Sequence, residues 1–440
     1  MIGNTIFDNG IVQLYKADAR SLPIPDNSVD CVVTSPPYWG LRDYGTAEWI
    51  GGDEGCDHTI SMPLKWNDPK RGTDYTRPEV AHRGGDSSKC FLCGAKRIDE
   101  QIGLEPTPEE YCSTMVQVFR EVWRVLKPTG TVWLNLGDSY SSQGGGQVEQ
   151  TVRTSDDYVN AGQMGSSGIG TSRKPVSGLK PKDLVGIPWR VAFALQADGW
   201  YLRSDIIWSK PNPMPESVSD RPTKAHEYIF LLTKSPRYYY DADAIREQAV
   251  GERWGGHKPM NLNNTKDTNN VFNGLTRERD MMPSHRNKRT VWEITTQPYP
   301  EAHFATYPES LVSPCILAGT SEKGVCAECG NPWVRESIVT NVPERETRDN
   351  RIGVIPGRDH ASRMNSKAMV KVDREFTGWQ PTCDCDAETV PATILDPFIG
   401  SGTTVAVAQK LGRRGVGVDI SNEYLELASK RIGSISLPMF

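Results

Sequence analysis

The chain has 440 residues, which is enough for two or three domains or for one domain enlarged by inserts. Hydrophobic residues make up 37% of the chain, and its formal net charge of -5 excludes a simple basic nucleic-acid-binding protein. Contact with nucleic acid would therefore have to come from a local basic patch. No apolar run approaches the roughly 20 residues of a membrane helix, and residues 1–10 lack the apolar stretch of a signal peptide.

Two strand-like runs near the N-terminus lead into a proline-rich turn. Residues 11–15 alternate between apolar and polar side chains, and residues 29–33 form a mostly apolar run typical of a buried parallel strand. The second run ends in the sequence Thr34-Ser35-Pro36-Pro37-Tyr38. Because proline fixes φ and lacks an N–H, this turn is expected to form a rigid ledge at the carboxyl end of the strand.

The ledge offers one hydroxyl group, unpaired backbone carbonyls and one flat aromatic ring. These groups suit holding a planar base by its exocyclic amine while the base stacks on Tyr38. The candidate catalytic residues are therefore Ser35, Pro36, Pro37 and Tyr38. The alternative is a proline-rich turn in which Tyr38 only covers the core.

Cysteines gather in two polar segments that interrupt the α/β pattern. The first segment, residues 51–100, contains Cys56, His58, Cys90 and Cys93, and the second, residues 321–390, contains Cys326, Cys329, Cys383 and Cys385. Each set supplies four ligands for tetrahedral zinc and leaves no open position for chemistry, so two structural Zn²⁺ sites are expected. His82 is an alternative ligand in the first set, and unrelated surface residues are the other interpretation. The remaining cysteines, Cys31, Cys112 and Cys315, are interpreted as core residues.

Helices and strands are expected between the cysteine-rich segments. A helix over residues 107–126 has Thr107 as its cap and Pro108 at its first position, and its apolar stripe is Met115, Val118, Phe119, Val122 and Val125. A strand at residues 131–136 follows, and then a loop rich in Gly and Ser at residues 139–178. A second helix is expected over residues 182–198, with its inward side chains being Leu184, Val191, Ala194 and Leu195. Strands at residues 200–208 and 227–233 complete this part.

Residues 253–289 are polar and rich in asparagine, and they contain eight Lys or Arg against three Asp or Glu. Arginine and asparagine pair with base edges, and basic side chains bind phosphate. This segment is therefore a candidate DNA-reading element, with the candidate contacts Arg277, Arg279, Arg286, Lys288 and Arg289. A solvated loop is the alternative.

The C-terminal part of the chain carries the clearest α/β pattern. After a short helix at residues 307–317, a strand at residues 393–395 leads into a glycine-containing turn, Asp396-Pro397-Phe398-Ile399-Gly400-Ser401-Gly402-Thr403-Thr404. A helix at residues 405–411, a strand at residues 415–419 and a helix at residues 422–432 follow. Such a turn lets a ligand approach the backbone, and Asp419 at the next strand end can hold ribose hydroxyls. Val405 stands where dinucleotide-binding proteins have a third glycine, which points to a nucleoside ligand without pyrophosphate.

Together the ledge and the glycine-containing turn resemble the amino-methyltransferases of DNA, in the motif order of their β group. Serine at position 35 resembles the cytosine-N4 members more than most adenine-N6 members. The resemblance implies the class I S-adenosylmethionine-dependent methyltransferase fold with permuted motif order, here with two cysteine-rich zinc-type inserts. This fold is α/β, a doubly wound and mostly parallel sheet of seven strands. The cofactor-binding residues that it implies are Asp18, Asp396, Phe398, Gly400, Gly402, Thr403, Asp419, Phe304 and Pro308.

The resulting hypothesis is a site-specific DNA cytosine-N4 methyltransferase that uses S-adenosylmethionine and acts on double-stranded DNA. Adenine-N6 methylation is the near alternative. More distant alternatives are methylation of RNA, methylation of a protein side-chain amide, and a zinc-dependent nucleic-acid-binding module without catalysis. A homodimer and a restriction endonuclease partner are further candidates, and the family suggests a bacterial or phage-type cytoplasmic enzyme.

The expected organisation splits the methyltransferase domain around its inserts. Residues 1–50 form its catalytic part, and residues 391–440 form its cofactor-binding part. Residues 101–250 and 291–320 belong to the same domain. Residues 51–100 and 321–390 are the zinc-type inserts, and residues 251–290 are the DNA-recognition segment.

Overall fold

The computed structural model describes residues 4–40, 48–53, 55–58, 62–67, 74–81, 89–98, 101–141, 179–248, 285–297, 307–340 and 373–435. The chain divides into two compact units, each built from separated segments. The first unit takes in Met1–Tyr238, Thr290–Ile316 and Thr393–Phe440, and the second takes in Tyr239–Arg289 and Leu317–Ala392.

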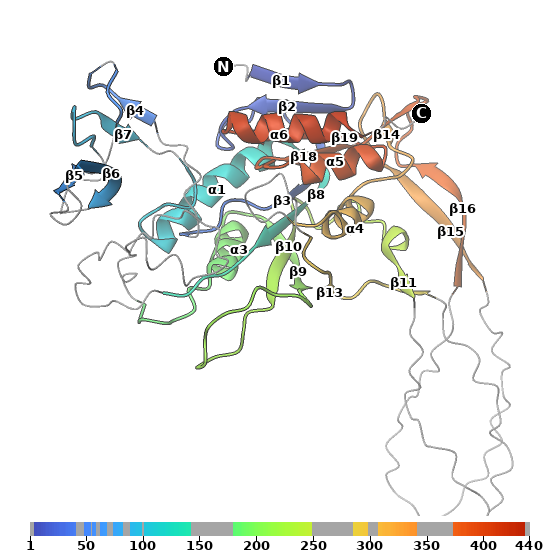
Figure 1. Cartoon of the computed structure of the whole chain (residues 1–440). Coiled ribbons are helices and arrows are strands. Elements are labelled where there is room, and N and C mark those ends of the chain that lie inside the picture. The colour runs from blue at the N-terminus through green and yellow to red at the C-terminus, as the bar shows by residue number, and fades with distance from the viewer. Residues whose placement is uncertain are drawn as a thin grey trace, which may run out of the picture. The chain divides into compact units, whose positions relative to one another are not determined.

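A sheet of nine strands forms the centre of the first unit (Figure 1). Five neighbouring pairs are parallel and three are antiparallel, so the predicted mostly parallel sheet is confirmed. In spatial order the strands are β1 (Asn4–Asp8), β2 (Val12–Lys16), β19 (Arg414–Asp419), β18 (Thr393–Asp396), β3 (Val29–Thr34), β8 (Leu126–Leu136), β10 (His226–Thr233), β9 (Tyr201–Ser209) and β13 (Val291–Glu293).

The sheet has nine strands rather than the predicted seven. The first additional strand, β1, pairs antiparallel with β2, and the side chain of Asn9 accepts the N–H groups of Ile11 and Val12 in the turn between them. The second, β13, pairs three residues with β9. Both lie at the edges of the sheet, and β1 is largely exposed, so its sequence lacks the apolar pattern of a buried strand.

Helices cover both faces of this sheet, as the doubly wound fold requires. Helices α1 (Pro108–Val125) and α3 (Ile187–Ala197) contribute to one apolar cluster, while α5 (Thr403–Lys410) and α6 (Asn422–Gly433) contribute to another. Leu14 of β2 belongs to the second cluster, whereas its neighbour Tyr15 packs against the first. Because successive side chains of a strand point to opposite faces, the two clusters lie on opposite sides of the sheet.

Helix α1 confirms its sequence signals. The hydroxyl of Thr107 accepts the N–H of Glu110, Pro108 begins the helix, and the predicted apolar stripe is fully buried. The following strand was predicted to begin at Thr131, but β8 begins at Leu126, directly after the helix. Residues 127–130 therefore belong to the strand and not to a separate turn.

The prediction for α3 was wrong at its beginning. The helix starts at Ile187 and not near Lys182, and Leu184, expected to face the core, is exposed. The reason is a long-range cap, since the Asp138 carboxylate accepts the N–H groups of both Gly186 and Ile187. A carboxylate at this position satisfies donors that would otherwise have no partner at the start of a helix.

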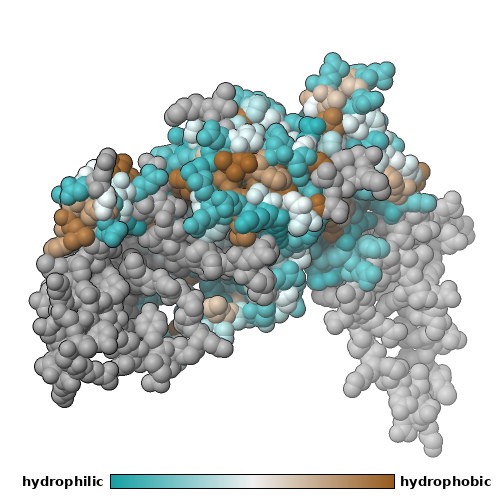
Figure 2. All heavy atoms as spheres, turned by 45° about the horizontal axis from the view of Figure 1, so that its top comes forward, coloured by the Kyte–Doolittle hydropathy of each residue, from teal (hydrophilic) through white to brown (hydrophobic). Residues whose placement is uncertain are grey.

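Smaller elements make up the rest of the described chain. Helix α4 (Glu309–Gly319) lies two residues further along the chain than the short helix predicted at residues 307–317, and η1 (Asp243–Ile245) is a single 3₁₀ turn. Two-stranded pairs join β4 (Glu48–Ile50) to β7 (Lys96–Ile98), β5 (Met62–Asn67) to β6 (Asp74–Ala81), β11 (Glu247–Gln248) to β12 (His285–Arg286), β14 (Val325–Cys326) to β17 (Thr389–Val390), and β15 (Trp333–Thr340) to β16 (Asp373–Pro381). In Figure 2 hydrophobic residues lie in small groups among hydrophilic ones. None of the helices in the described ranges is both long and apolar enough to cross a membrane.

Candidate active site and metal centres

The proline ledge lies at the carboxyl end of β3, as predicted. Because β18 and β8 flank β3 in parallel, the carboxyl ends of all three strands meet at one edge of the sheet. The ledge is fixed from α1, where the Tyr111 hydroxyl donates to the Pro37 carbonyl at 2.9 Å. Pro36 is buried, while Ser35, Pro37 and Tyr38 are only half-buried. The hydroxyl and the ring of the ledge therefore sit at a firmly held strand end.

Tyr38 is placed by groups from β8 and β10 and by a neighbour within the ledge. Its ring lies against Gly137, where a Cβ atom would come within 2.5 Å of Tyr38 Cε2. Its hydroxyl lies 2.7 Å from Glu227 Oε2 and 3.0 Å from Asn135 Oδ1, and we assign its single proton to the shorter contact with the carboxylate. Ser35 Oγ donates in turn to the Tyr38 hydroxyl at 3.2 Å. Burial, followed by the charge of Glu227, holds the pKa of Tyr38 well above its usual value, so this phenol stays protonated.

The sequence did not identify Glu227 or Asn135 as residues of the site. Glu227 lies 189 residues from Tyr38 along the chain, and nothing next to it in sequence marks it as part of a site. Its only local signal is a carboxylate at the start of an otherwise apolar strand, β10, which runs antiparallel to β8. This arrangement brings the first residues of β10 to the sheet edge where β3 and β8 end.

Asp396 joins the ledge to the glycine-containing turn. Its fully buried carboxylate accepts hydrogen bonds from the hydroxyls of Thr34, Tyr307 and Thr404 at 2.7–2.8 Å, and from the N–H of Phe398 at 3.1 Å. Burial raises the pKa of Asp396, and these hydrogen bonds oppose the rise. A carboxylate has about four acceptor positions, so the protein's own donors already use the whole capacity of Asp396.

Asp419, at the end of β19, keeps free acceptor capacity. One of its oxygens accepts the N–H of Gly400 at 3.0 Å, and the other accepts the N–H of Ser421 at 2.9 Å. The backbone N–H of Ile420 also acts on this carboxylate, and of its roughly four acceptor positions at least one is left for a ligand hydroxyl. Gly402 has a φ of 81°, and a Cβ there would come within 3.0 Å of Ala428 Cβ. Glycine at this position therefore allows α6 to pack closely against the turn.

Burial raises the pKa of Asp419 to about 6, which predicts a pH-dependent stability. An acid whose folded-state pKa exceeds its unfolded value stabilises the fold at low pH, and this contribution is lost as pH rises through the folded pKa. We expect Asp419→Asn to remove up to about 3 kcal/mol of pH dependence in the free energy of unfolding between roughly pH 4 and pH 7. Urea unfolding of both proteins across this range measures the difference, and parallel curves would contradict the assignment.

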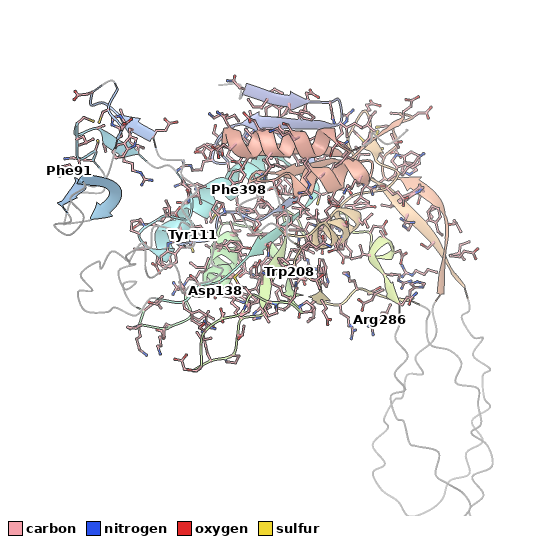
Figure 3. The ribbon with its side chains drawn as sticks, viewed as in Figure 1. Phe91, Tyr111, Asp138, Trp208, Arg286 and Phe398 are labelled. Atoms are coloured by element: carbon pink, nitrogen blue, oxygen red, sulfur yellow. The ribbon has the colours of Figure 1, made fainter. Side chains whose placement is uncertain are left out.

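The other predicted cofactor residues have varied surroundings. The Asp18 carboxylate accepts the backbone N–H and the guanidinium of Arg20. Burial would raise the pKa of Asp18, but these hydrogen bonds and the charge of Arg20 outweigh it and lower the pKa. Pro308 is buried beside Tyr307, and Phe304 lies outside the described residues. Figure 3 labels Phe398 on the turn and Tyr111 on α1, two parts of the chain that the fold brings to the same region.

Comparison with known proteins decides the family. A family model described as "DNA methylase", for N6 and N4 methyltransferases, matches residues 29–328 and 389–430, which include both the ledge and the glycine-containing turn. The chain belongs to this DNA methylase family. The resemblance stated from the sequence is therefore confirmed, and the chain is a DNA methyltransferase.

Two curated relatives cover nearly the whole methylase. Type II methyltransferase M.Cfr9I of Citrobacter freundii is 34% identical over 421 residues, which are 95% of this chain and 87% of the relative. Type II methyltransferase M.SmaI of Serratia marcescens is 35% identical over 405 residues, 92% of this chain and 84% of the relative. Among solved structures, PvuII DNA methyltransferase (cytosine-N4-specific) matches with a TM-score of 0.44 at 13% identity, covering 97% of this chain and 89% of that one.

The methylase brings each predicted set of metal ligands together. In each set, one ligand atom from every residue lies within 4.8 Å of the others; the sets are Cys56, His58, Cys90 and Cys93, and Cys326, Cys329, Cys383 and Cys385. In the first set Cys93 Sγ lies 3.3 Å from His58 Nδ1. All ten cysteines are free thiols, so neither set is tied up in disulfides. The predicted alternative ligand His82 lies outside the described residues.

All five predicted DNA-contacting residues of the methylase fall in its second unit. Arg277 and Arg279 lie outside the described residues. Arg286 and Arg289 both donate to the same carboxylate oxygen of Glu247, at 2.8 and 3.1 Å, and Lys288 lies between them in sequence. A side chain held in this way is ordered, and a phosphate would have to compete with Glu247 for both guanidinium groups.

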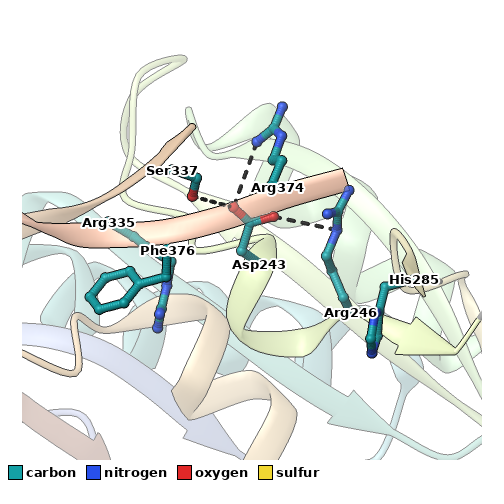
Figure 4. A pocket seen from close by; sticks show the side chains of 7 residues that line it. All are labelled: Asp243, Arg246, His285, Arg335, Ser337, Arg374 and Phe376. Carbon is teal, nitrogen blue, oxygen red and sulfur yellow. Dashed lines mark hydrogen bonds and ion pairs between the residues drawn. The ribbon is translucent and has the colours of Figure 1, made fainter. Parts of the chain in front are cut away.

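A cavity of about 320 Å³ lies within the second unit of the methylase (Figure 4). Its centre is Asp243, which accepts a hydrogen bond from Ser337 at 3.2 Å and pairs with Arg246 at 3.3 Å and Arg374 at 3.6 Å. The lining residues are Asp243, Arg246, His285, Arg335, Ser337, Arg374 and Phe376. Arg335 pairs with Asp241 and Glu322. Acidic partners thus offset the arginine charge, and this geometry gives no reason to expect a phosphate here.

Proposed function

We propose that this DNA methylase transfers the methyl group of S-adenosylmethionine to the exocyclic N4 amine of a cytosine flipped out of double-stranded DNA. The observation that carries the proposal is the 2.7 Å hydrogen bond from Thr34 to Asp396. It joins the residue just before Ser35 to the first residue of the glycine-containing turn. The base-holding ledge and the cofactor turn are therefore neighbours at one sheet edge, as methyl transfer between their ligands requires.

The turn suits the nucleoside part of S-adenosylmethionine. Asp419 would hold the ribose hydroxyls with the acceptor capacity that its backbone N–H partners leave open. Gly400, Gly402 and Thr403 would line the pocket, Phe398 and Pro308 would border it, and Asp18 would lie near the adenine. Because protein donors surround the Asp396 carboxylate, we propose that Asp396 acts mainly by holding the turn and the ledge together. When bound, S-adenosylmethionine supplies a methyl group on an electrophilic sulfonium.

The ledge would prepare the amine. The exocyclic nitrogen of cytosine is nearly planar because its lone pair is delocalised into the ring. If Ser35 Oγ and the Pro36 carbonyl each accept one N–H, the nitrogen is drawn toward tetrahedral geometry and its lone pair can face the methyl group. Tyr38 would stack on the flipped base with the ring face opposite Gly137. Positioning and hydrogen bonding then supply most of the rate increase.

Adenine-N6 methylation is the second candidate, since the family model covers both N6 and N4 enzymes. A ledge that holds an exocyclic amine through two N–H acceptors serves either base. Position 35 is serine and not aspartate. With serine there, the motif resembles the cytosine-N4 members of the family, which favours cytosine. The Type II designation of the relatives supports a paired restriction endonuclease as partner, and a homodimer remains a prediction.

The methylated base is the direct test. We expect that incubation with unmethylated double-stranded DNA and S-adenosylmethionine, followed by digestion and mass spectrometry of nucleosides, yields N4-methylcytosine. DNA incubated without enzyme is the control. N6-methyladenine would keep the fold and the roles of the ledge but overturn the cytosine assignment. Neither product from a protein that binds S-adenosylmethionine would overturn the proposed DNA substrate.

We further propose that both cysteine clusters hold structural Zn²⁺. Four ligand atoms within 4.8 Å of one another, mostly thiols, suit tetrahedral zinc and leave no open position for a substrate. The second unit in particular has little else to stabilise it. Among its described residues the buried apolar side chains are Tyr239, Ile245, Ala318, Val325, Cys326 and Ala392. Arg286, Lys288 and Arg289, together with Arg277 and Arg279, remain the proposed DNA contacts.

A further inference from the structure

A row of hydrogen-bonded groups leads from the ledge to a carboxylate. We propose that Glu227 receives the proton that leaves the amine after methyl transfer, by way of Ser35 and Tyr38. This inference rests on the proposed function, because it concerns the same ledge. It supplies a proton acceptor that the ledge alone lacks, since a serine hydroxyl is too weak a base to keep the proton.

The geometry of the row is continuous. Ser35 Oγ donates to the Tyr38 hydroxyl at 3.2 Å, and that hydroxyl donates to Glu227 Oε2 at 2.7 Å. Ser35 gives its only proton to Tyr38, so both lone pairs of Oγ are left to accept an N–H of the base. With the Tyr38 proton on its shorter contact, to Glu227 and not to Asn135, each hydroxyl in the row donates away from the base and toward Glu227.

The Glu227 carboxylate lies in a largely enclosed place and is held on both oxygens. Its side chain is 16% exposed, and its other oxygen pairs with Lys210, whose ammonium also lies 4.2 Å from the Trp208 ring centroid. Lys210 directly follows β9, and its backbone N–H donates to the Ala225 carbonyl, which fixes it beside the start of β10. The Lys210 contact thus fixes one oxygen of Glu227 and leaves Oε2 to the Tyr38 hydroxyl.

The proton balance closes within this row. Formation of the N–C bond and cleavage of the S–C bond leave one surplus proton on the methylated nitrogen. That proton passes to Ser35 Oγ as the Ser35 proton passes to Tyr38 and the Tyr38 proton passes to Glu227 Oε2. The two hydroxyls end as they began, the methylated amine is neutral, and Glu227 carries the proton. Lys210 remains charged and accepts nothing. Glu227 touches no substrate and acts on the base only through Tyr38 and Ser35.

A purely structural role for Glu227 makes a different prediction. If Glu227 only held Tyr38 in place, glutamine would serve, because its carbonyl oxygen can accept the same hydrogen bond. Glutamine cannot take up a proton at neutral pH. Glu227→Gln therefore separates proton acceptance from positioning, and Glu227→Asp keeps a carboxylate within reach of the hydroxyl.

The test is the single-turnover rate of methylation at pH 7.5, with enzyme in excess over DNA and S-adenosylmethionine saturating. We expect Glu227→Gln to slow the wild-type rate by about 100-fold at pH 7.5 while the affinity for S-adenosylmethionine stays the same. We expect Glu227→Asp, which keeps a carboxylate within reach of the Tyr38 hydroxyl, to recover part of the rate that Glu227→Gln loses.

Charged and titratable neighbours of Glu227 outside the row are Lys210 after β9, Lys224 before β10 and His226 on β10. His226→Asn changes a side chain beside Glu227 without breaking the row. It is therefore the control, and it should methylate at about the wild-type rate.

Tyr38→Phe provides a second, independent break in the row. Its ring can still stack on a base, but it has no hydroxyl to relay the proton. We expect it to be as slow as Glu227→Gln, and the double variant to be no slower than the slower single variant. A Glu227→Gln enzyme within about threefold of wild type, or additive losses in the double variant, would overturn the relay. If Glu227→Gln also loses S-adenosylmethionine binding, Tyr38→Phe decides, and a fast Tyr38→Phe enzyme rejects the relay.

These outcomes are distinct from failure of the proposed function. A wild-type enzyme that makes N6-methyladenine removes the cytosine assignment, and the relay is then tested unchanged on adenine. A wild-type enzyme that methylates no base removes both proposals. An active wild type with a fast Glu227→Gln variant removes the relay alone.

Discussion

Replacement of Ser35 by alanine is expected to lower the methylation rate by about 100- to 1,000-fold, because it deletes one of two acceptors for the amine and the first group of the relay. The affinity for S-adenosylmethionine should stay near the wild-type value, since the Thr34 to Asp396 bond does not involve Ser35. Rapid-quench methylation and equilibrium binding measure the two effects separately.

The matched control for this variant is Ser113→Ala. Ser113 lies on the exposed side of α1, and its hydroxyl donates to the Glu109 carbonyl of its own helix. This variant loses the same atom away from the sheet edge and should methylate at the wild-type rate. Full activity in Ser35→Ala would refute the role given to the ledge hydroxyl. Equal loss in both variants would point to a general defect in folding.

Removal of one proposed zinc ligand, by Cys329→Ser, is expected to have the largest effect on stability. The metal content should fall from about two Zn²⁺ per chain to about one, since the first cluster stays intact. Structural zinc sites contribute roughly 10–16 kcal/mol to folding, and the second unit has few buried apolar side chains, so it should unfold. Elemental analysis gives the metal content, and hydrogen exchange of the β15–β16 pair gives the local stability.

Cys112→Ser is the control for thiol loss. Cys112 is half-buried on α1 and belongs to neither cluster, so this variant should keep both zinc ions and the wild-type exchange pattern. A purified wild type without zinc would contradict the metal proposal. So would a Cys329→Ser protein that retains two zinc ions.

Features set by near neighbours in sequence could be predicted well. Helix α1 is an example, because its cap, its first residue and its apolar stripe all lie within one helix. The structure shows Thr107 as the cap, Pro108 at the first position and the stripe buried. The ledge and the glycine-containing turn carry their own local geometry through proline and glycine, so the sequence also placed them at strand ends. The two cysteine sets could also be predicted, because within each set the ligands occur as closely spaced pairs typical of zinc sites.

Features that depend on distant partners could not be predicted. The start of α3 follows from Asp138, which lies 48 residues before Gly186, and no local signal at Leu184 reveals that cap. Glu227 belongs to the site only because β10 runs antiparallel beside β8. Arg286 and Arg289 look like free basic side chains in the sequence, yet in the structure they share Glu247. Edge strand β1 carries no apolar pattern, so the number of strands was missed as well.

The order of strands has a consequence for how the protein is made. β2 and β3 are synthesised early, but in the sheet β19 and β18 lie between them. Thr34 and Asp396, which meet in the finished protein, are 362 residues apart in the chain. While a ribosome translates the intervening sequence, β2 and β3 each wait with an unpaired inner edge, of the kind that favours aggregation and chaperone binding. Methylation activity should therefore arise only after β19 has left the ribosome, and a nascent chain interrupted before that point would be inactive.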